Sequence, residues 1–379
     1  MSKNQIYLDH ASTTFIDNEV LQYMHEIMQE SYGNPSSIHA LGRKSRALIE
    51  KARKSVAKIL NASVGEIYFT SSATEANNMI IKRAVVDLGV KTFITSPTEH
   101  HCVLHALGSV ARENKSDINF LTTDNNGDVS LPELESTILN AKKNGPVMVS
   151  IMHGNNEIGN IHPIEEISQL CVNHGVYFHC DAVQTIGKYP IDLQKIKINF
   201  LSGTAHKFHG PKGVGFFYMN NENILTPFID GGAQERNMRA GTENLYGIAA
   251  LAKALEMYHE DQKNRINHIV EIRDYFESAV SQSIPSVYVN ANDARNRMAH
   301  ISSISFPPSD KADMIMFNLD IHGICASSGS ACSAGIEEDS HVLTSIRHPK
   351  DRKTVRFSFA FNTTKEEIDY TINILKKIT

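Results

Sequence analysis

The chain lacks both a long apolar run and a large excess of charge of one sign, and each absence excludes a class of protein. No uninterrupted apolar stretch approaches the ~18–20 residues of a membrane-spanning helix, so we expect no membrane partner. The net charge is −5, whereas nucleic-acid-binding domains usually carry a basic patch, so we expect no nucleic-acid partner. The first residues also lack the charged and then apolar pattern of a secretory signal.

Cysteine is scarce, and its spacing argues against two common structural uses. The cysteines are odd in number, and no Cys-x-x-Cys pair occurs among them. These features disfavour a disulfide framework and a structural zinc site, and they favour a reducing environment. We therefore predict no metal site and a cytoplasmic location. The five cysteines are Cys102, Cys171, Cys180, Cys325 and Cys332.

The length of 379 residues predicts two domains, because a single core rarely serves so long a chain. From residue 66 onward, short apolar runs alternate regularly with amphipathic stretches. This alternation predicts an α/β fold with a mostly parallel central sheet and helices on both faces. After residue 230 the pattern predicts a polar loop over 231–242, a long helical region from about 245 to 283, and then shorter strands with a helix near 310–319. This order indicates a smaller α+β domain. We predict a large domain over 14–258 and a small domain formed by 1–13 and 259–379.

The stretch from Ile198 to Gly215 has the composition of a cofactor site. An apolar strand pattern ends at Leu201, small and hydroxyl-bearing residues follow, and Lys207 precedes a Gly-Pro-Lys-Gly turn. A lysine at a strand end can form a Schiff base with a carbonyl cofactor, and nearby N–H groups and hydroxyls can hold a phosphate. Pyridoxal 5′-phosphate needs both features. For Lys207 alone, a solvated loop lysine is the simpler interpretation, so other residues must decide.

Polar residues follow other predicted strands at their carboxyl ends, where sheets of this type bind ligands. Asp181 could pair with a protonated pyridine nitrogen, or it could cap the next helix. His100 could stack on a planar ring and move protons near pH 7. The turn at Ala73 and Thr74 opens a helix and could bind an anion, or it could be a simple N-cap. Several polar clusters at one edge of the sheet favour a binding site.

Two residues of the C-terminal third are further candidates. Cys332 lies in a run of small residues from 327 to 335, which predicts an exposed nucleophile on a loop, or else a tolerated surface cysteine. Arg356 alternates with apolar neighbours on a predicted strand, where it could clamp a carboxylate or lie on the surface. We interpret the other four cysteines as buried and inert.

Nine motifs, in order along residues 6–377, resemble those of the cysteine desulfurases, which are fold-type-I pyridoxal-phosphate enzymes of the NifS and IscS type. No single motif is specific, but the set is. The motifs are Tyr7-Leu8-Asp9, Gly33-Asn34-Pro35-Ser36-Ser37, Ser72-Ala73-Thr74-Glu75, Thr98-Glu99-His100, Asn155-Asn156-Glu157-Ile158-Gly159, Asp181-Ala182-Val183-Gln184, His206-Lys207 with Gly210-Pro211-Lys212-Gly213, Arg239-Ala240-Gly241-Thr242, and Ser327 to Cys332.

The resemblance implies a complete site with pyridoxal 5′-phosphate as cofactor. Lys207 would carry the Schiff base, and Lys207, His100 and Cys332 would be the catalytic residues. Substrate contacts would come from Asn34, Asn156 and Arg356. Cofactor contacts would come from Ala73, Thr74, His100, Asn156, Asp181, Gln184, Thr204, His206, Lys207 and Thr242.

The resemblance also implies the reaction and the partners. Sulfur would leave L-cysteine, giving L-alanine and a persulfide on Cys332, and would pass to an acceptor such as an iron–sulfur scaffold protein or a tRNA-thiolation system. Thr242 would reach the phosphate of a neighbouring subunit, which implies a homodimer. Two alternatives stay open: a selenocysteine lyase or other class V aminotransferase-type enzyme, and a scaffold without catalysis.

Overall fold

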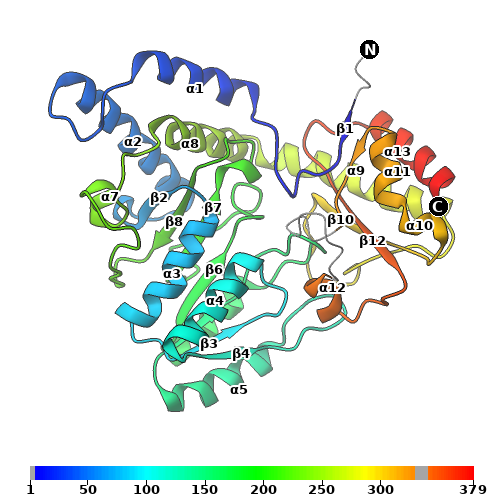
Figure 1. Ribbon diagram of the computed structural model, residues 1–379, viewed down its shortest axis with the longest axis horizontal. Coiled ribbons are helices and arrows are strands. Elements are labelled where there is room, and N and C mark those ends of the chain that lie inside the picture. The colour runs from blue at the N-terminus through cyan, green and yellow to red at the C-terminus, as the bar shows by residue number, and fades with distance from the viewer. Residues whose placement is uncertain (1–4, 329–339) are drawn as a thin grey trace.

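A computed structural model describes residues 5–328 and 340–379 (Figure 1). Its central feature is a seven-stranded sheet with the order β2-β8-β7-β6-β5-β3-β4. Within this sheet β8 runs antiparallel to both neighbours, and all other adjacent pairs are parallel. The mostly parallel arrangement confirms the predicted fold class. The strands are β2 (Ile67–Thr70), β3 (Thr92–Thr95), β4 (Asp117–Phe120), β5 (Val147–Ser150), β6 (Tyr177–Asp181), β7 (Phe200–Thr204) and β8 (Gly215–Met219).

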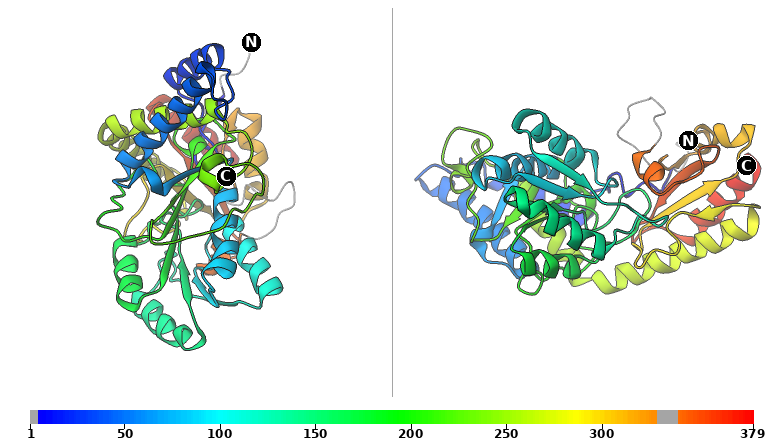
Figure 2. Two further views of the ribbon diagram at one scale, coloured as in Figure 1. Left: turned by 90° about the vertical axis from the view of Figure 1, so that its left-hand side faces the viewer. Right: turned by 90° about the horizontal axis from the view of Figure 1, so that it is seen from below.

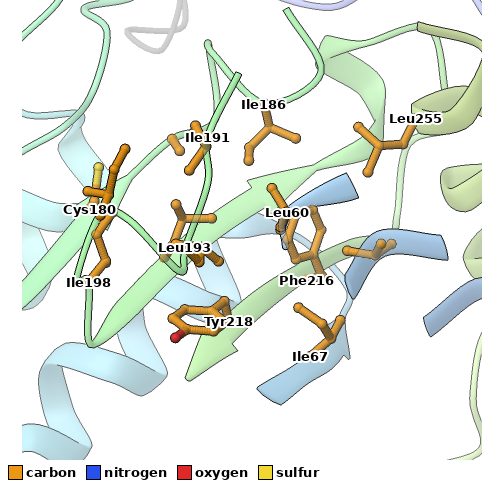
Figure 3. Close-up of a cluster of buried hydrophobic side chains, with 14 of the residues drawn as sticks. Leu60, Ile67, Cys180, Ile186, Ile191, Leu193, Ile198, Phe216, Tyr218 and Leu255 are labelled. Atoms are coloured by element: carbon orange, nitrogen blue, oxygen red, sulfur yellow. The ribbon is translucent and has the colours of Figure 1, made fainter. Parts of the chain in front are cut away.

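Helices cover both faces of this sheet, as near-continuous apolar strands require. Every residue of β3, β5, β7 and β8 is buried. On one face, α3 (Ala73–Asp87) and α4 (His101–Asn114) pack on side chains that include Phe93 and Phe217. The opposite face carries a larger cluster, part of which Figure 3 shows around Phe216 and Leu255. Its helices are α1 (Asn18–Glu30), α2 (Ala40–Ile59), α5 (Leu131–Ala141), α6 (Ile164–His174) and α8 (Leu245–Glu260).

A second group of elements surrounds a smaller antiparallel sheet with the order β12-β10-β9 (Figure 2). A separate parallel pair joins β1 (Ile6–Tyr7) to β11 (Ile324–Cys325). The other strands are β9 (Tyr288–Val289), β10 (Ile301–Phe306) and β12 (Lys353–Ser358). The helices are α9 (Gln262–Ser283), α10 (Asp310–Asp313), α11 (Ile315–Ile321), α12 (His341–Ser345) and α13 (Lys365–Ile378).

The hydrophobic side chains of this second group form their own cluster, which includes Leu8, Phe276 and Phe357. Because this cluster is separate from those of the large sheet, we propose that the chain has two domains with the predicted bounds, 14–258 and 1–13 with 259–379. Among the described residues, no helix has both the length and the apolar character needed to cross a bilayer.

Two predicted helical regions differ from the structure. The region 245–283 is two helices, because α8 ends at Glu260 and α9 begins at Gln262 after Asp261. The region 310–319 is also divided, into α10 and α11. A short helix, α7 (Gln234–Asn237), lies where a loop was expected, and Glu235 and Arg236 within it are left-handed with φ of 44° and 58°.

The segment after β1 passes between the two groups of elements and brings them to one site. The N–H of Ala11 donates to Ser358 Oγ at 2.8 Å, on the side of the small sheet. The N–H of Thr14 donates to the carbonyl of His206 at 2.9 Å, just beyond β7 of the large sheet. Residues 9–14 therefore lie beside the carboxyl ends of the central strands.

Candidate active site

A cavity of about 350 Å³ lies at the carboxyl ends of the large-sheet strands, where the sequence predicts the site. It receives residues from the segment after β1, from the loops after β2, β3, β5, β6 and β7, and from β12. The structure thus brings together most of the predicted site residues. Those that line the cavity are Ala73, Thr74, His100, Asn156, Asp181, Gln184, Thr204, His206, Lys207 and Arg356.

Lys207 ends a short 3-10 helix (Ala205–Lys207) that directly follows β7. Its Nζ donates to the carbonyls of Ala11 and Ser12, both at 2.7 Å. These two carbonyls come from the segment after β1, so that segment orients the amine at the cavity. An amine held in this way is placed for covalent chemistry with a carbonyl ligand.

Asp181 is a buried carboxylate at the end of β6. Its Oδ2 accepts from Asn77 Nδ2 at 2.7 Å, and its Oδ1 accepts from the N–H of Val183 at 3.0 Å. Burial raises the pKa of the Asp181 carboxyl above its ordinary value. The described residues offer it no ion pair, so a cation in the cavity would compensate it. A protonated pyridine nitrogen fits that requirement.

His100 is the N-cap of α4, and this position determines which ring nitrogen carries the proton. Its Nδ1 accepts from the N–H of Cys102 at 3.1 Å. Because a backbone N–H only donates, Nδ1 has no proton and the neutral ring is protonated at Nε2. Burial, and then the charge of Lys207, lower the pKa of His100 to about 4. At neutral pH the ring is therefore uncharged and has an N–H donor at Nε2.

The N-terminus of α3 supplies an anion site at the other end of the cavity. Ser72 caps this helix, and its Oγ accepts from the N–H of Glu75 at 3.2 Å. The first N–H groups, at Ala73 and Thr74, and the helix dipole favour a phosphate here. Gly215 of β8 lies so close that a Cβ on it would be 2.8 Å from the carbonyl carbon of Ser72. The backbone alone therefore shapes this cradle.

Two further residues predicted to hold the phosphate have other partners in this structure. Thr204 Oγ1 donates to the carbonyl of Val214 at 3.0 Å. His206 Nδ1 lies 3.2 Å from Thr13 Oγ1. Burial and the charge of Lys207 lower the pKa of His206 to about 3, so its ring is neutral. A phosphate here would meet neutral donors and one lysine rather than a cluster of cations.

The remaining cavity residues connect the large sheet to β12. Gln184 Nε2 donates to the carbonyl of Ala11 at 2.9 Å. Arg356 is buried, its Nη1 donates to the carbonyl of Asn156 at 2.7 Å, and its Nη2 donates to Asp9 Oδ1 at 2.9 Å. The alternative of a surface arginine is excluded, and a guanidinium facing the cavity is suited to a carboxylate.

Two of the predicted site residues that the structure describes, Asn34 and Thr242, do not line this cavity. Asn34 lies between α1 and α2, where its Oδ1 accepts from the N–H of Ser36 at 2.8 Å. Thr242 is exposed and lines a separate hollow of about 200 Å³ with Thr70 and Ser71. Cys332 lies outside the described residues, so its predicted role stays a prediction, as do those of Asn34 and Thr242.

Sequence reasoning assigned no role to three residues at or beside the cavity, namely Ser12 and Cys102, which line it, and Asp9, which contacts Arg356. Asp9 and Ser12 both contact Arg356. Asp9 belongs to the motif Tyr7-Leu8-Asp9, to which sequence reasoning assigned no role. Cys102 was expected to be buried and inert. It is only half-buried, lines the cavity and has its Sγ 3.0 Å from His100 Nδ1, but burial raises the pKa of its thiol to about 12, which agrees with low reactivity. Its place two residues after His100, in the first turn of a helix, was the available signal. Cys171 and Cys180 are buried as expected, and Cys325 is half-buried.

A lysine after β7, a buried carboxylate at the end of β6 and a helix N-terminus for phosphate define the fold-type-I class of pyridoxal-phosphate enzymes. The chain matches the family described as Aminotransferase class-V over residues 6–371, and it belongs to that family. The protein is therefore an enzyme, and its cofactor is pyridoxal 5′-phosphate.

Within this family the chain is similar to cysteine desulfurases. It is 41% identical to "Cysteine desulfurase IscS" of Dictyoglomus turgidum, over 99% of this chain and 95% of that protein. A solved structure titled "NIFS-LIKE PROTEIN" matches with a TM-score of 0.90 and 33% identity, over 99% of both chains. The NifS-like protein of Rickettsia africae matches with a TM-score of 0.89 and 30% identity, again over 99% of both.

Proposed function

We propose that the protein is a cysteine desulfurase, which removes the sulfur of L-cysteine and leaves L-alanine. The observation that carries this proposal is the single cavity in which Lys207, Asp181 and Arg356 meet. These are an amine for the carbonyl cofactor, a carboxylate for its ring nitrogen and a guanidinium for an amino-acid carboxylate. The similarity to cysteine desulfurases over nearly the whole chain selects the substrate within this class.

Pyridoxal 5′-phosphate, when bound, supplies an electron sink that stabilises negative charge on the substrate carbons. In our proposal Asp181 would pair with its ring nitrogen, and the first turn of α3 with Thr204 and His206 would hold its phosphate. Gln184 would donate to its phenolic oxygen, and His100 would stack on its ring. The uncompensated carboxylate of Asp181 and the backbone cradle beside Gly215 support this arrangement.

Different side chains of the cavity then bind the substrate and transfer its protons. Arg356 and Asn156 hold the carboxylate of L-cysteine, which fixes its orientation. Lys207 Nζ moves protons to and from the substrate carbons, because the carbonyls of Ala11 and Ser12 hold this amine at the cavity. His100 donates from Nε2, and because its ring is neutral it adds no positive charge to those of Lys207 and Arg356.

Sulfur transfer requires a nucleophile, and we propose Cys332. Its thiolate attacks the sulfur of the substrate, so an S–S bond forms as the C–S bond breaks. The electron pair of the C–S bond stays on carbon, which takes up a proton to give L-alanine. The enzyme keeps a persulfide, and no external oxidant or reductant is required for this balance.

The proposed enzyme also needs a second subunit and a sulfur acceptor. We propose a homodimer in which Thr242 reaches the phosphate site of the second subunit, which agrees with the exposure of Thr242 outside its own cavity. The persulfide sulfur passes to an acceptor such as an iron–sulfur scaffold protein or a tRNA-thiolation system. Four described cysteines without a disulfide support a reducing, cytoplasmic setting.

Mass spectrometry after exposure to L-cysteine tests the proposal directly. The peptide that contains Cys332 should gain one sulfur atom, and L-alanine should appear in equal amount in the first turnover. A Cys332→Ser variant should keep the cofactor absorbance and lose both products. Undiminished cysteine turnover by that variant would instead favour a selenocysteine lyase or another aminotransferase-type activity, which the relatives do not favour. A colourless protein with no borohydride-reducible adduct on Lys207 would favour a non-catalytic scaffold.

A further inference from the structure

The arginine that should bind the substrate carboxylate is already bound to a carboxylate of the protein. Asp9 Oδ1 accepts a hydrogen bond from Arg356 Nη2 at 2.9 Å. The Arg356 side chain is 2% exposed and the Asp9 side chain is 18% exposed. Little water screens this ion pair, so the charge of Asp9 acts strongly on Arg356.

A count of the guanidinium hydrogens shows where a ligand must bind. Nη2 donates to Asp9 and also to Ser12 Oγ at 2.6 Å, so both of its hydrogens are used. Nη1 donates to the carbonyl of Asn156, and Nε is buried with no hydrogen-bond partner among the described residues. A bidentate carboxylate binds along an edge, either Nε with Nη2 or Nη1 with Nη2. Both edges contain Nη2, so the ligand competes with Asp9 and Ser12.

Asp9 is itself held in place and does not depend on Arg356 for its position. Its Oδ1 also accepts from Ser12 Oγ at 2.9 Å and from Ser327 Oγ at 2.8 Å. Three donors from separate segments therefore converge on this one carboxylate oxygen. A ligand that takes a hydrogen of Nη2 still meets the negative charge of Asp9 beside the guanidinium.

We propose that Asp9 is an internal competitor for the substrate carboxylate: it holds Arg356 in the free enzyme and weakens the binding of carboxylate ligands there. This inference rests on the proposed role of Arg356. Removal of the Asp9 charge should strengthen the binding of a carboxylate ligand to Arg356, for two reasons. A buried arginine without its partner is costly until a ligand neutralises it, and the ligand no longer meets a like charge. In the native enzyme the weaker binding of carboxylates at Arg356 favours release of the product L-alanine.

Binding of L-alanine to the cofactor-loaded enzyme, measured by absorbance titration and calorimetry, tests the inference. Asp9→Asn should bind L-alanine about tenfold tighter than the wild type, which corresponds to about 1.4 kcal/mol. Its KM for L-cysteine should fall, and its melting temperature without ligand should also fall. Asp9→Ser is the second neutral variant if Asp9→Asn does not fold. Asp117→Asn, at an exposed strand position, is the matched control and should bind L-alanine as the wild type does.

The outcomes separate this inference from the proposed function. Unchanged or weaker L-alanine binding by Asp9→Asn or Asp9→Ser would overturn the competitor role. Arg356→Gln should lose most of its affinity for L-alanine, and that result tests only the proposed binding of the carboxylate by Arg356. If Arg356→Gln binds L-alanine normally, the proposed role of Arg356 fails. If it loses affinity while the Asp9 variants are unchanged, only the competitor inference fails.

Discussion

Asn77 of α3 donates a hydrogen bond from Nδ2 to Asp181 Oδ2 at 2.7 Å. Its Oδ1 in turn lies 3.1 Å from His179 Nε2, and His179 Nδ1 lies 2.8 Å from Ser150 Oγ. Because an ionised carboxylate only accepts, the direction of the whole chain is determined: Ser150 donates to His179, His179 to Asn77 and Asn77 to Asp181. Buried groups of α3, β5 and β6 thus orient the carboxylate.

We therefore expect Asn77→Ala to weaken cofactor binding without contacting the cofactor. Loss of a buried hydrogen bond to a charged group costs about 1.5–3 kcal/mol, which is roughly ten- to hundredfold in affinity. Titration of the apoprotein with pyridoxal 5′-phosphate, followed by absorbance, measures the effect. Asn140→Ala, at an exposed position of α5, is the control. Equal affinities for the two variants would show that Asp181 keeps its orientation without Asn77.

Glu99 should behave as a neutral acid in the folded protein. Burial raises its pKa well above the ordinary value, and its Oε1 accepts from the N–H of Met152 at 2.6 Å. The unfolded chain releases this proton near pH 4.5, so Glu99 stabilises the fold below that pH and loses this contribution as pH rises toward its folded pKa.

Glu99→Gln keeps the acceptor and removes the titration. Its stability relative to the wild type should therefore increase between pH 5 and 8, as chemical denaturation at several pH values can measure. Glu99→Ala leaves the N–H of Met152 unpaired and should lose about 1–3 kcal/mol at every pH. If the free energy of unfolding of Glu99→Gln equals that of the wild type at every pH, the Glu99 carboxyl is not neutral in the folded protein.

His162 should limit stability on the acid side. Both ring nitrogens are buried without a hydrogen-bond partner among the described residues, and burial lowers the pKa of His162 to about 4. The unfolded ring has an ordinary pKa of 6.5, so stability is complete above pH 6.5 and is lost as pH falls toward about 4. At pH 5 the loss is about 2 kcal/mol. His162→Leu should reduce the drop in melting temperature between pH 7 and 5, whereas an unchanged drop would exclude His162 as its cause.

Gly215→Ala should damage the phosphate end of the cavity. The added Cβ would lie 2.8 Å from both the Gly203 carbonyl oxygen and the Ser72 carbonyl carbon, so β7 and the start of α3 must move apart. We expect the affinity for the cofactor to fall roughly tenfold or more, or about 1.4 kcal/mol. Gly65→Ala is the matched control, since the nearest atom to its Cβ would be 3.6 Å away. Normal cofactor affinity in Gly215→Ala would contradict the backbone cradle.

The secondary structure around the large sheet was predictable because its strands are short apolar runs between amphipathic helices. The strand that was expected to end at Leu201 is the exception, because β7 continues to Thr204 through the small and hydroxyl-bearing residues that follow. The division at Asp261 was not predictable, because helical apolar spacing continues on both sides of it. Only the packing of α8 on α1 and α2, and of α9 on α13, shows why the chain must divide there.

Local sequence patterns were sufficient to place particular chemical groups at the ends of the strands, since Asp181 is the last residue of β6 and Lys207 lies three residues after β7. In a parallel sheet such ends share one edge, so local patterns suffice to predict that these residues meet. The partner of Arg356, in contrast, is evident only in the tertiary structure. Asp9 lies 347 positions away, and the path of the segment after β1 brings them together. That path depends on how the elements around the large sheet pack against those around the small sheet, which no local periodicity encodes.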